Sequence, residues 1–135
     1  MAGMRTNVID TEKITINLGL IDLGRIDLLV QEGFYSNRTD LIRTAIRNQL
    51  ATHTDVLNQS VARRTLVLGL QEFSRRDLEA VRKSRTKVRI QVLGLVRIAD
   101  DVSPALARET IESIAVLGAL HASPAVKAAL ADRIH

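Results

Sequence analysis

The first regular pattern along the chain is a strict alternation of apolar and polar residues in the run KITINL, from Lys13 to Leu18. Alternation with a period of two, built on β-branched side chains, predicts a short strand with one apolar and one polar face. Gly19 ends this pattern. Residues 1–11 carry no periodic pattern, and we expect a flexible arm there.

Helical spacing replaces the alternation further along the chain. An apolar stripe predicts a helix over about residues 22–32, and its members are Leu23, Ile26, Leu29 and Val30. Gly33 stands where a left-handed C-terminal cap is expected. Phe34 follows as the apolar residue that packs back against Leu29.

A second helix is predicted to start near Asn37, whose side chain can accept hydrogen bonds from the first turn. Asp40, three residues later, gives a pattern similar to a capping box, with Asp in place of Glu. The apolar stripe of this helix consists of Leu41, Ile42, Ala45, Ile46 and Leu50. We expect the helix to end near His53, and we interpret the polar residues 54–63 as a linker.

The remaining residues, 64–135, repeat one short motif. Val-Leu-Gly occurs three times, with spacings of 25 and 24 residues between its glycines, which are Gly69, Gly94 and Gly118. Each copy is followed by a serine where a helix can start, at Ser74, Ser103 and Ser123. Two of these serines precede a proline, which suits the first helical position because the N–H there has no partner. The period predicts three stacked strand–helix repeats, with chance matches in a Leu- and Val-rich chain as the alternative.

The composition of the chain mainly excludes certain kinds of site and classes of protein. The chain has 135 residues, enough for one ordinary domain or two small ones, and 46% of them are hydrophobic, which indicates a folded protein. It has no cysteine and three scattered histidines, so thiolate sites are excluded and no histidine metal site is expected. Aromatic residues make up 2%, too few for a surface that stacks single-stranded bases. We expect neither a membrane span nor a signal peptide, and therefore a cytoplasmic protein.

The net charge of +4 admits nucleic acid as a partner without demonstrating it. Residues 1–53 are neutral, with six basic and six acidic side chains, so the basic excess lies in residues 54–135. Within residues 63–89 there are nine basic side chains against three acidic ones. This stretch predicts either extra contacts to DNA phosphates or ordinary solvated charges.

The segment from Lys13 to Leu50 resembles the ribbon-helix-helix DNA-binding family, the Arc/MetJ/CopG type of bacterial regulator. The resemblance rests on the order of four features: the alternating run KITINLG, a helix that ends in glycine, the turn GFYSNR and the run IRTAIR of the second helix. It covers about 40 of the 135 residues. Each motif is short, but their order and spacing together are fairly specific.

A lone strand before two helices has no partner within its own segment, although its backbone groups need one. The resemblance implies that two chains pair these strands antiparallel and insert the ribbon into the DNA major groove. It assigns the base contacts to the outward residues Lys13, Thr15 and Asn17. Lysine can donate to guanine, asparagine can pair with adenine, and threonine can contact a base edge or a thymine methyl group. Taken alone, the three residues would be solvent-facing side chains on a strand.

Members of this family also bind a DNA phosphate at the amino terminus of the second helix, where free amides and the helix dipole favour anions. The resemblance carries this role to Ser36, Asn37, Arg38 and Thr39. Further contacts to the DNA backbone are expected from Arg5, Arg63 and Arg64. As alternatives, Asn37 is a plain helix cap and Arg38 is a solvated charge.

The chain is therefore predicted to be an α+β protein. A ribbon-helix-helix domain for dimerisation and DNA binding occupies residues 12–53, and a small α/β domain of three strand–helix repeats occupies residues 64–135. The predicted function is a sequence-specific regulator of transcription, a repressor in keeping with the resemblance, that binds a palindromic or repeated operator as a homodimer. Unpaired strand edges in the repeats predict assembly into tetramers or larger species. The residues suggest no catalytic constellation, cofactor site or metal site, so we do not expect an enzyme.

Two other classes of function stay open. The protein could be an antitoxin that represses its own gene through the ribbon and binds a toxin through its C-terminal part. It could also be a structural scaffold in which the ribbon serves only for dimerisation.

Overall fold

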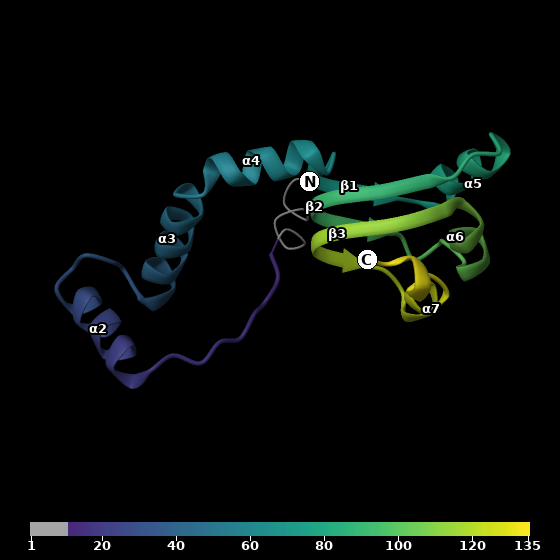
Figure 1. Ribbon diagram of the computed structural model, residues 1–135. Coiled ribbons are helices and arrows are strands. Elements are labelled where there is room, and N and C mark those ends of the chain that lie inside the picture. The colour runs from purple at the N-terminus through teal and green to yellow at the C-terminus, as the bar shows by residue number, and fades with distance from the viewer. Residues whose placement is uncertain (1–10) are drawn as a thin grey trace. The chain divides into compact units, whose positions relative to one another are not determined.

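The computed structural model describes residues 11–135, which fall into two units, Thr11–Gln59 and Ser60–His135. In the first unit, residues 11–19 run as an extended segment without regular secondary structure, followed by helices α2 (Leu20–Gln31) and α3 (Arg38–Ala51) (Figure 1). The expected flexible arm lies outside the described residues, apart from its last residue.

The turn between α2 and α3 starts with the predicted glycine cap. Gly33 has a φ of 87°, a left-handed conformation that favours glycine. Its N–H donates to the carbonyl of Val30 at 3.1 Å, and the N–H of Phe34 donates to the carbonyl of Leu29 at 3.0 Å. These two bonds form a Schellman motif, which satisfies carbonyl groups that the helix end leaves without partners. The prediction of a cap at Gly33 is confirmed.

Asn37 caps the start of α3, as predicted. Its side-chain oxygen accepts a hydrogen bond from the amide of Asp40 at 2.8 Å. The reciprocal bond differs from a capping box, because the Asp40 carboxylate accepts from the amide of Ser36 at 3.0 Å rather than from that of Asn37. The start of α3 is therefore held from both sides by short polar side chains.

Residues 54–63, which we interpreted as a linker from their polar composition, form the helix α4 (Thr54–Arg63). Three apolar residues at helical spacing, Val56, Leu57 and Val61, give this segment an amphipathic pattern within its polar sequence. The boundary between the two units falls inside α4, between Gln59 and Ser60.

The second unit alternates strands and helices. Its elements are β1 (Val67–Phe73), α5 (Arg75–Lys83), β2 (Val88–Ile98), α6 (Pro104–Thr110), β3 (Ile111–His121), α7 (Pro124–Ala129) and the 3-10 helix η1 (Ala131–Arg133). The strands form one parallel sheet in the order β1-β2-β3. Equivalent residues of the Val-Leu-Gly motifs lie side by side, and the three glycines pair as Gly69, Gly94 and Gly118.

Each helix of this sheet starts at the predicted serine. Ser74, Ser103 and Ser123 are N-caps, and each side chain accepts a hydrogen bond from the amide three residues later. At Ser74 the bond is reciprocated by the carboxylate of Asp77, which completes a capping box. The two prolines occupy the first helical turn after their serines. The three predictions of a helix start are confirmed.

The buried core lies in the second unit. Its fully or nearly fully buried members are Leu78, Ile90, Val92, Val96, Ile98, Val102, Leu106, Ala107, Ile111, Ile114, Val126 and Leu130. Leu78, Leu106 and Val126 come one from each helix, so each helix covers the sheet with apolar side chains. Among residues 11–135, Thr110 is the one buried polar residue, and its hydroxyl is satisfied because it donates to the carbonyl of Leu106 at 2.7 Å.

The three glycines form a column across the sheet, and each has a positive φ, at 118°, 143° and 125° along the chain. A Cβ atom on Gly94 would overlap the carbonyl oxygen of Gly69, and one on Gly118 would overlap that of Gly94. Figure 1 shows that β3 is strongly bent and does not run straight along its whole length. Gly94 and Gly118 are therefore glycines because a side chain there would collide with the backbone of the preceding strand, whereas Gly69 shares only the positive φ.

The last residues of the chain cover part of β3. Ile134 forms a parallel bridge with Ile114, and the amide of His135 donates to the carbonyl of Ile114 at 2.8 Å. Arg133 donates to the carbonyl of Ile111 at 2.8 Å and also to that of Arg108. The amino-terminal half of β3 is thus closed by the chain's own C-terminus.

Candidate nucleic-acid interface

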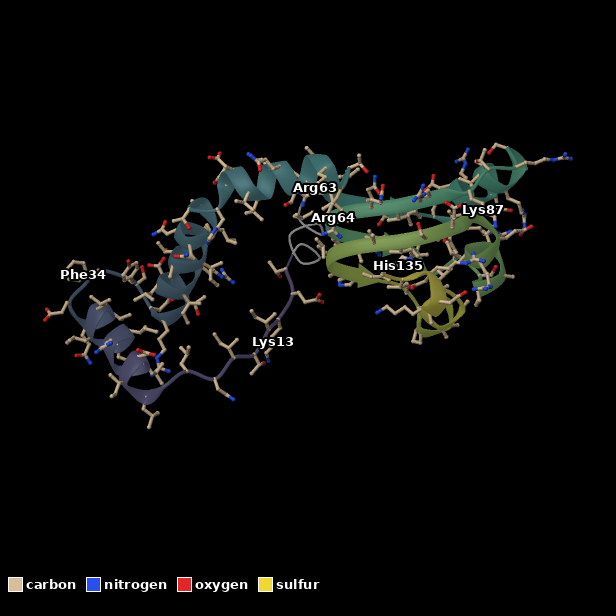
Figure 2. The ribbon with its side chains drawn as sticks, viewed as in Figure 1. Lys13, Phe34, Arg63, Arg64, Lys87 and His135 are labelled. Atoms are coloured by element: carbon tan, nitrogen blue, oxygen red, sulfur yellow. The ribbon has the colours of Figure 1, made fainter. Side chains whose placement is uncertain are left out.

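The extended segment before α2 carries the residues predicted to contact bases. Lys13, Thr15 and Asn17 are all exposed, and Figure 2 shows Lys13 on this segment. The apolar residues that alternate with them are also exposed, with exposed fractions of 74% for Ile14 and 61% for Ile16. The segment forms no strand in the single chain, where it has no second strand to pair with.

The two helices of this unit likewise lack a core of their own. Neither α2 nor α3 contains a buried residue. Large apolar side chains that remain exposed on α2, on α3 and in the turn between them are Leu20, Ile21, Leu28, Leu29, Phe34, Ile46 and Leu50. Apolar surface of this extent marks a site of association with another protein surface.

The amino terminus of α3 brings together the residues predicted to contact phosphate. The first amides of a helix have no partner within the helix. In α3, Asn37 satisfies the amide of Asp40, whereas the amides of Arg38 and Thr39 make no hydrogen bond to another described residue. Ser36, Asn37, Arg38 and Thr39 are all exposed, so an anion can reach this helix end.

Arg38 is held against α2 by Asp27. Its Nε atom donates to Oδ1 of Asp27 at 2.7 Å, and its Nη2 atom donates to Oδ2 at 2.8 Å. The hydrogen bond and charge of the guanidinium lower the pKa of the Asp27 carboxyl from its usual 3.8, while the carboxylate raises the pKa of Arg38. Arg38 is therefore fixed in position beside the helix end.

The sequence patterns did not predict that Asp27 would pair with Arg38. Asp27 and Arg38 are eleven residues apart and lie on different helices, so no rule of helical spacing connects them. Only the tight turn at Gly33, which folds α2 and α3 together, makes the pair recognisable.

The model of the Ribbon-Helix-Helix transcriptional regulator family matches residues 9–127 of this chain. The chain belongs to this family. The protein is accordingly a DNA-binding regulator of transcription, and regulators of this family usually dimerise. Comparison with curated proteins and with solved structures finds no match. The matched range extends beyond the ribbon-helix-helix segment into the second unit, so the family comprises both parts.

The basic residues of the stretch 63–89 do not form one surface of this ribbon-helix-helix protein. Arg63 and Arg64 lie at the opposite end of the second unit from Lys87 (Figure 2). Several others are already engaged: Arg75 and Arg82 pair with Glu79, Arg82 also with Glu109, and Arg89 with Glu112. Arg63 and Lys87 therefore do not belong to one compact patch, and contacts of this stretch with DNA stay a prediction.

Arg63 and Arg64, two of the three arginines expected to make extra backbone contacts, are exposed at the end of α4. The Nη2 atom of Arg63 lies 3.5 Å from the hydroxyl of Ser60. Arg5, the third, lies outside the described residues. Residues 11–135 contain no group of three or more His, Asp or Glu side chains arranged to hold a metal ion. No helix in this range is long and apolar enough to cross a membrane.

Proposed function

We propose that this ribbon-helix-helix protein is a sequence-specific repressor that binds double-stranded DNA as a homodimer. Residues 13–18 of two chains pair antiparallel, and the resulting ribbon enters the major groove. The observation that carries this proposal is the exposed alternation of the segment, in which Ile14, Ile16 and Leu18 lack cover in a single chain. A dimer would bury these apolar residues and present the polar face to DNA. We assign repression, rather than activation, on the resemblance to the family alone.

Base contacts fall to Lys13, Thr15 and Asn17 in this proposal. Their three chemistries are different, so together they can distinguish guanine, thymine and adenine. Each good contact is expected to contribute about 1–3 kcal/mol of discrimination against the wrong base. The dimer would apply the set twice, once to each half of a palindromic operator.

The amino terminus of α3 would clamp a phosphate on each side of the ribbon. Its exposed amides at Arg38 and Thr39 and the helix dipole attract the anion, while Ser36 and Asn37 offer polar side chains. Contacts of this kind matter here because residues 1–53 have no net charge and cannot rely on a general basic field. Arg5, Arg63 and Arg64 would add contacts to flanking phosphates.

The test is a binding titration on the DNA upstream of the protein's own gene, with random DNA as the competitor and at two salt concentrations. The Lys13/Thr15/Asn17→Ala variant is compared with wild type. Because each contact contributes about 1–3 kcal/mol, preference for the upstream DNA should fall at least about 100-fold. Lys87→Ala is the control, since it removes a charge from an exposed lysine of the second unit. Weak, salt-sensitive binding to all DNA by wild type and variant alike would contradict the proposal.

The C-terminal unit is proposed to join copies of the chain into larger species. The antitoxin alternative would require this unit to capture a toxin, and co-purification of a small basic protein would support it. The unit has its own buried core and capped helices, which favours a folded assembly module over an extended tail that wraps a partner. The scaffold alternative would be supported if no DNA were bound with sequence preference.

A further inference from the structure

The second half of β3 offers the same kind of edge that β1 already pairs with inside the chain. β1 pairs only with Val92–Ile98, the second half of β2. The C-terminal residues cover β3 only as far as Ile114, so within the second unit residues 116–121 have no strand on their outer side. These residues repeat the Val-Leu-Gly motif that β1 meets on β2. A β1 strand from a second copy would therefore find on β3 what its own β2 offers.

Both outer edges of the sheet expose the leucine of this motif. Leu68 on β1 is 64% exposed, and Leu117 on β3 is 45% exposed. Leu93 lies between them in the register, has a strand on each side and is only partly exposed. Contact between β1 of one copy and β3 of another would place Leu68 beside Leu117. Each leucine would then gain the second neighbouring strand that Leu93 has.

The glycine column has a direction. The position that a Cβ atom would take on Gly94 is occupied by the carbonyl oxygen of Gly69, and that on Gly118 by the carbonyl oxygen of Gly94. Each glycine of the column thus accommodates the carbonyl of the preceding strand and turns its own carbonyl toward the following one. The three glycines share this positive-φ conformation, so the repeat extends the same direction to the carbonyl of Gly118.

The two ends of the column are complementary to each other rather than to themselves. At Gly69, no described atom beyond its chain neighbours lies within 4 Å of the Cβ position. At Gly118, no following strand of the second unit receives the carbonyl. Two β1 edges would bring two empty positions together, and two β3 edges would bring two carbonyls together. Only a β3 edge against a β1 edge places a carbonyl in the empty position.

We propose that the second unit assembles head to tail, with β1 of one copy adding parallel to residues 116–121 of β3 in another copy. Gly69 then accommodates the carbonyl of Gly118 from that other copy. The inference rests on the proposed assembly role of this unit and names the two surfaces that perform it. A contact between two different surfaces gives rings where the rotation closes and filaments where it does not, so species larger than a dimer follow in both cases.

The rest of the unit is compatible with this register. The strands follow each other in chain order, and α6 contacts both α5 and α7, so an added copy would continue the helix layer with its α5 beside α7. Pairing of Gly69 with Gly118 also brings Glu72 beside His121, as Glu72 lies beside Arg97 within the chain. The contact therefore places no two like charges opposite each other.

The chain has no cysteine, so introduced thiols report on proximity without background. Full-length Leu68→Cys and Leu117→Cys, one of them isotope-labelled, are treated with a short bismaleimide, each alone and as an equal mixture. The masses of the linked products identify the chains in them. All pairs carry the same tether through the ribbon, so linking between the two different variants should be at least about tenfold faster than between identical ones. Equal rates, or faster linking of Leu68→Cys to itself, would overturn the inference.

A second variant fills the empty position of the column. Gly69→Ala, added to Leu68→Cys, places a methyl group that meets no atom beyond its chain neighbours in the single chain but would meet the carbonyl of Gly118 from another copy. Linking to Leu117→Cys should fall to the rate of identical chains, while circular dichroism shows the fold intact. Gly33→Ala is the matched control, because Gly33 also has a positive φ and an open Cβ position but lies in the first unit. Linking undiminished by Gly69→Ala would overturn the inference.

Sedimentation separates this inference from the proposals on which it builds. Species larger than a dimer without the faster mixed linking would preserve the assembly role and reject the two surfaces. A full-length protein that stays dimeric at every concentration would reject both. If the Lys13/Thr15/Asn17→Ala variant keeps its DNA preference, the proposal for the ribbon fails, yet fast mixed linking would still establish the head-to-tail contact.

Discussion

Arg38 and Asp27 join α3 to α2 through two nearly parallel hydrogen bonds of 2.7 and 2.8 Å. This geometry uses the Nε hydrogen and one Nη2 hydrogen of the guanidinium, so the Nη1 donors stay available for a phosphate. The pair therefore orients Arg38 and leaves some of its hydrogen-bond donors free. Asp27 is a positioning residue for the phosphate contact that we propose at this helix end.

Two variants separate positioning from direct contact. Arg38→Gln and Asp27→Asn both break the ion pair, but only the first removes a cation from the proposed DNA surface. Because the dimer would lose two phosphate contacts, Arg38→Gln should reduce the slope of log affinity against log salt by about 2. Asp27→Asn should leave the slope unreduced. Titrations at several salt concentrations measure both slopes, and the same reduction in both variants would contradict a direct contact.

The same pair makes stability depend on pH. The pKa of Asp27 in the folded protein lies below its usual value of 3.8, because the Arg38 guanidinium stabilises the carboxylate. Its contribution to stability is therefore present above pH 3.8 and is lost as the pH falls through the lowered folded pKa. Wild type should unfold at higher denaturant than Asp27→Asn at neutral pH, and the difference should vanish in acid. Asp100→Asn, at an exposed aspartate in a loop of the other unit, is the control for loss of a carboxylate elsewhere.

The glycine column gives a graded prediction about stability. Alanine at Gly69 meets no neighbouring atom and should cost only the strain of a positive φ, about 1–2 kcal/mol. Alanine at Gly94 adds an overlap with the carbonyl of Gly69, so its cost should exceed about 3 kcal/mol. Denaturant unfolding of the full chain, followed by hydrogen exchange in β2, measures the difference. Equal costs at the two positions would show that the close approach of the strands is absent in solution.

The two faces of the ribbon should respond differently to substitution. Ile16→Ser removes an apolar side chain that the dimer would bury, which should cost about 2 kcal/mol or more per chain. Thr15→Ser alters the opposite face and should leave the dimer intact. Sedimentation over a range of concentrations should show dissociation of the Ile16→Ser protein alone. A dimer unaffected by Ile16→Ser would mean that the apolar face is not at the interface.

The sequence was most informative where one residue decides the local backbone. The left-handed cap at Gly33 and the helix starts at Ser74, Ser103 and Ser123 follow from the chemistry of single side chains, and the structure contains them. The helix over residues 54–63 was missed because their polar composition outweighed three apolar residues at helical spacing. The interpretation of this segment as a linker between the two parts of the chain stays a prediction. Composition describes solubility, whereas spacing decides whether a segment can pack as a helix.

Contacts between distant parts of the chain could not be predicted from the sequence patterns. The pair of Asp27 with Arg38 and the closure of β3 by residues 133–135 depend on how turns fold back, and neither leaves a periodic trace. The basic stretch 63–89 shows the same limit. Its members are close in sequence, but Arg63 and Lys87 lie at opposite ends of the unit, because β1 and α5 separate them along the fold (Figure 2).

The glycine column restricts how the length of this protein can change during evolution. Gly69 and Gly94 are 25 residues apart, and a deletion of that whole interval would place Gly118 beside Gly69, an arrangement equivalent to the one that Gly94 now has with Gly69. A deletion of a few residues more or fewer would move a side chain into a place where backbone touches backbone. The second unit can therefore tolerate the gain or loss of a complete repeat more readily than a small insertion or deletion within a strand.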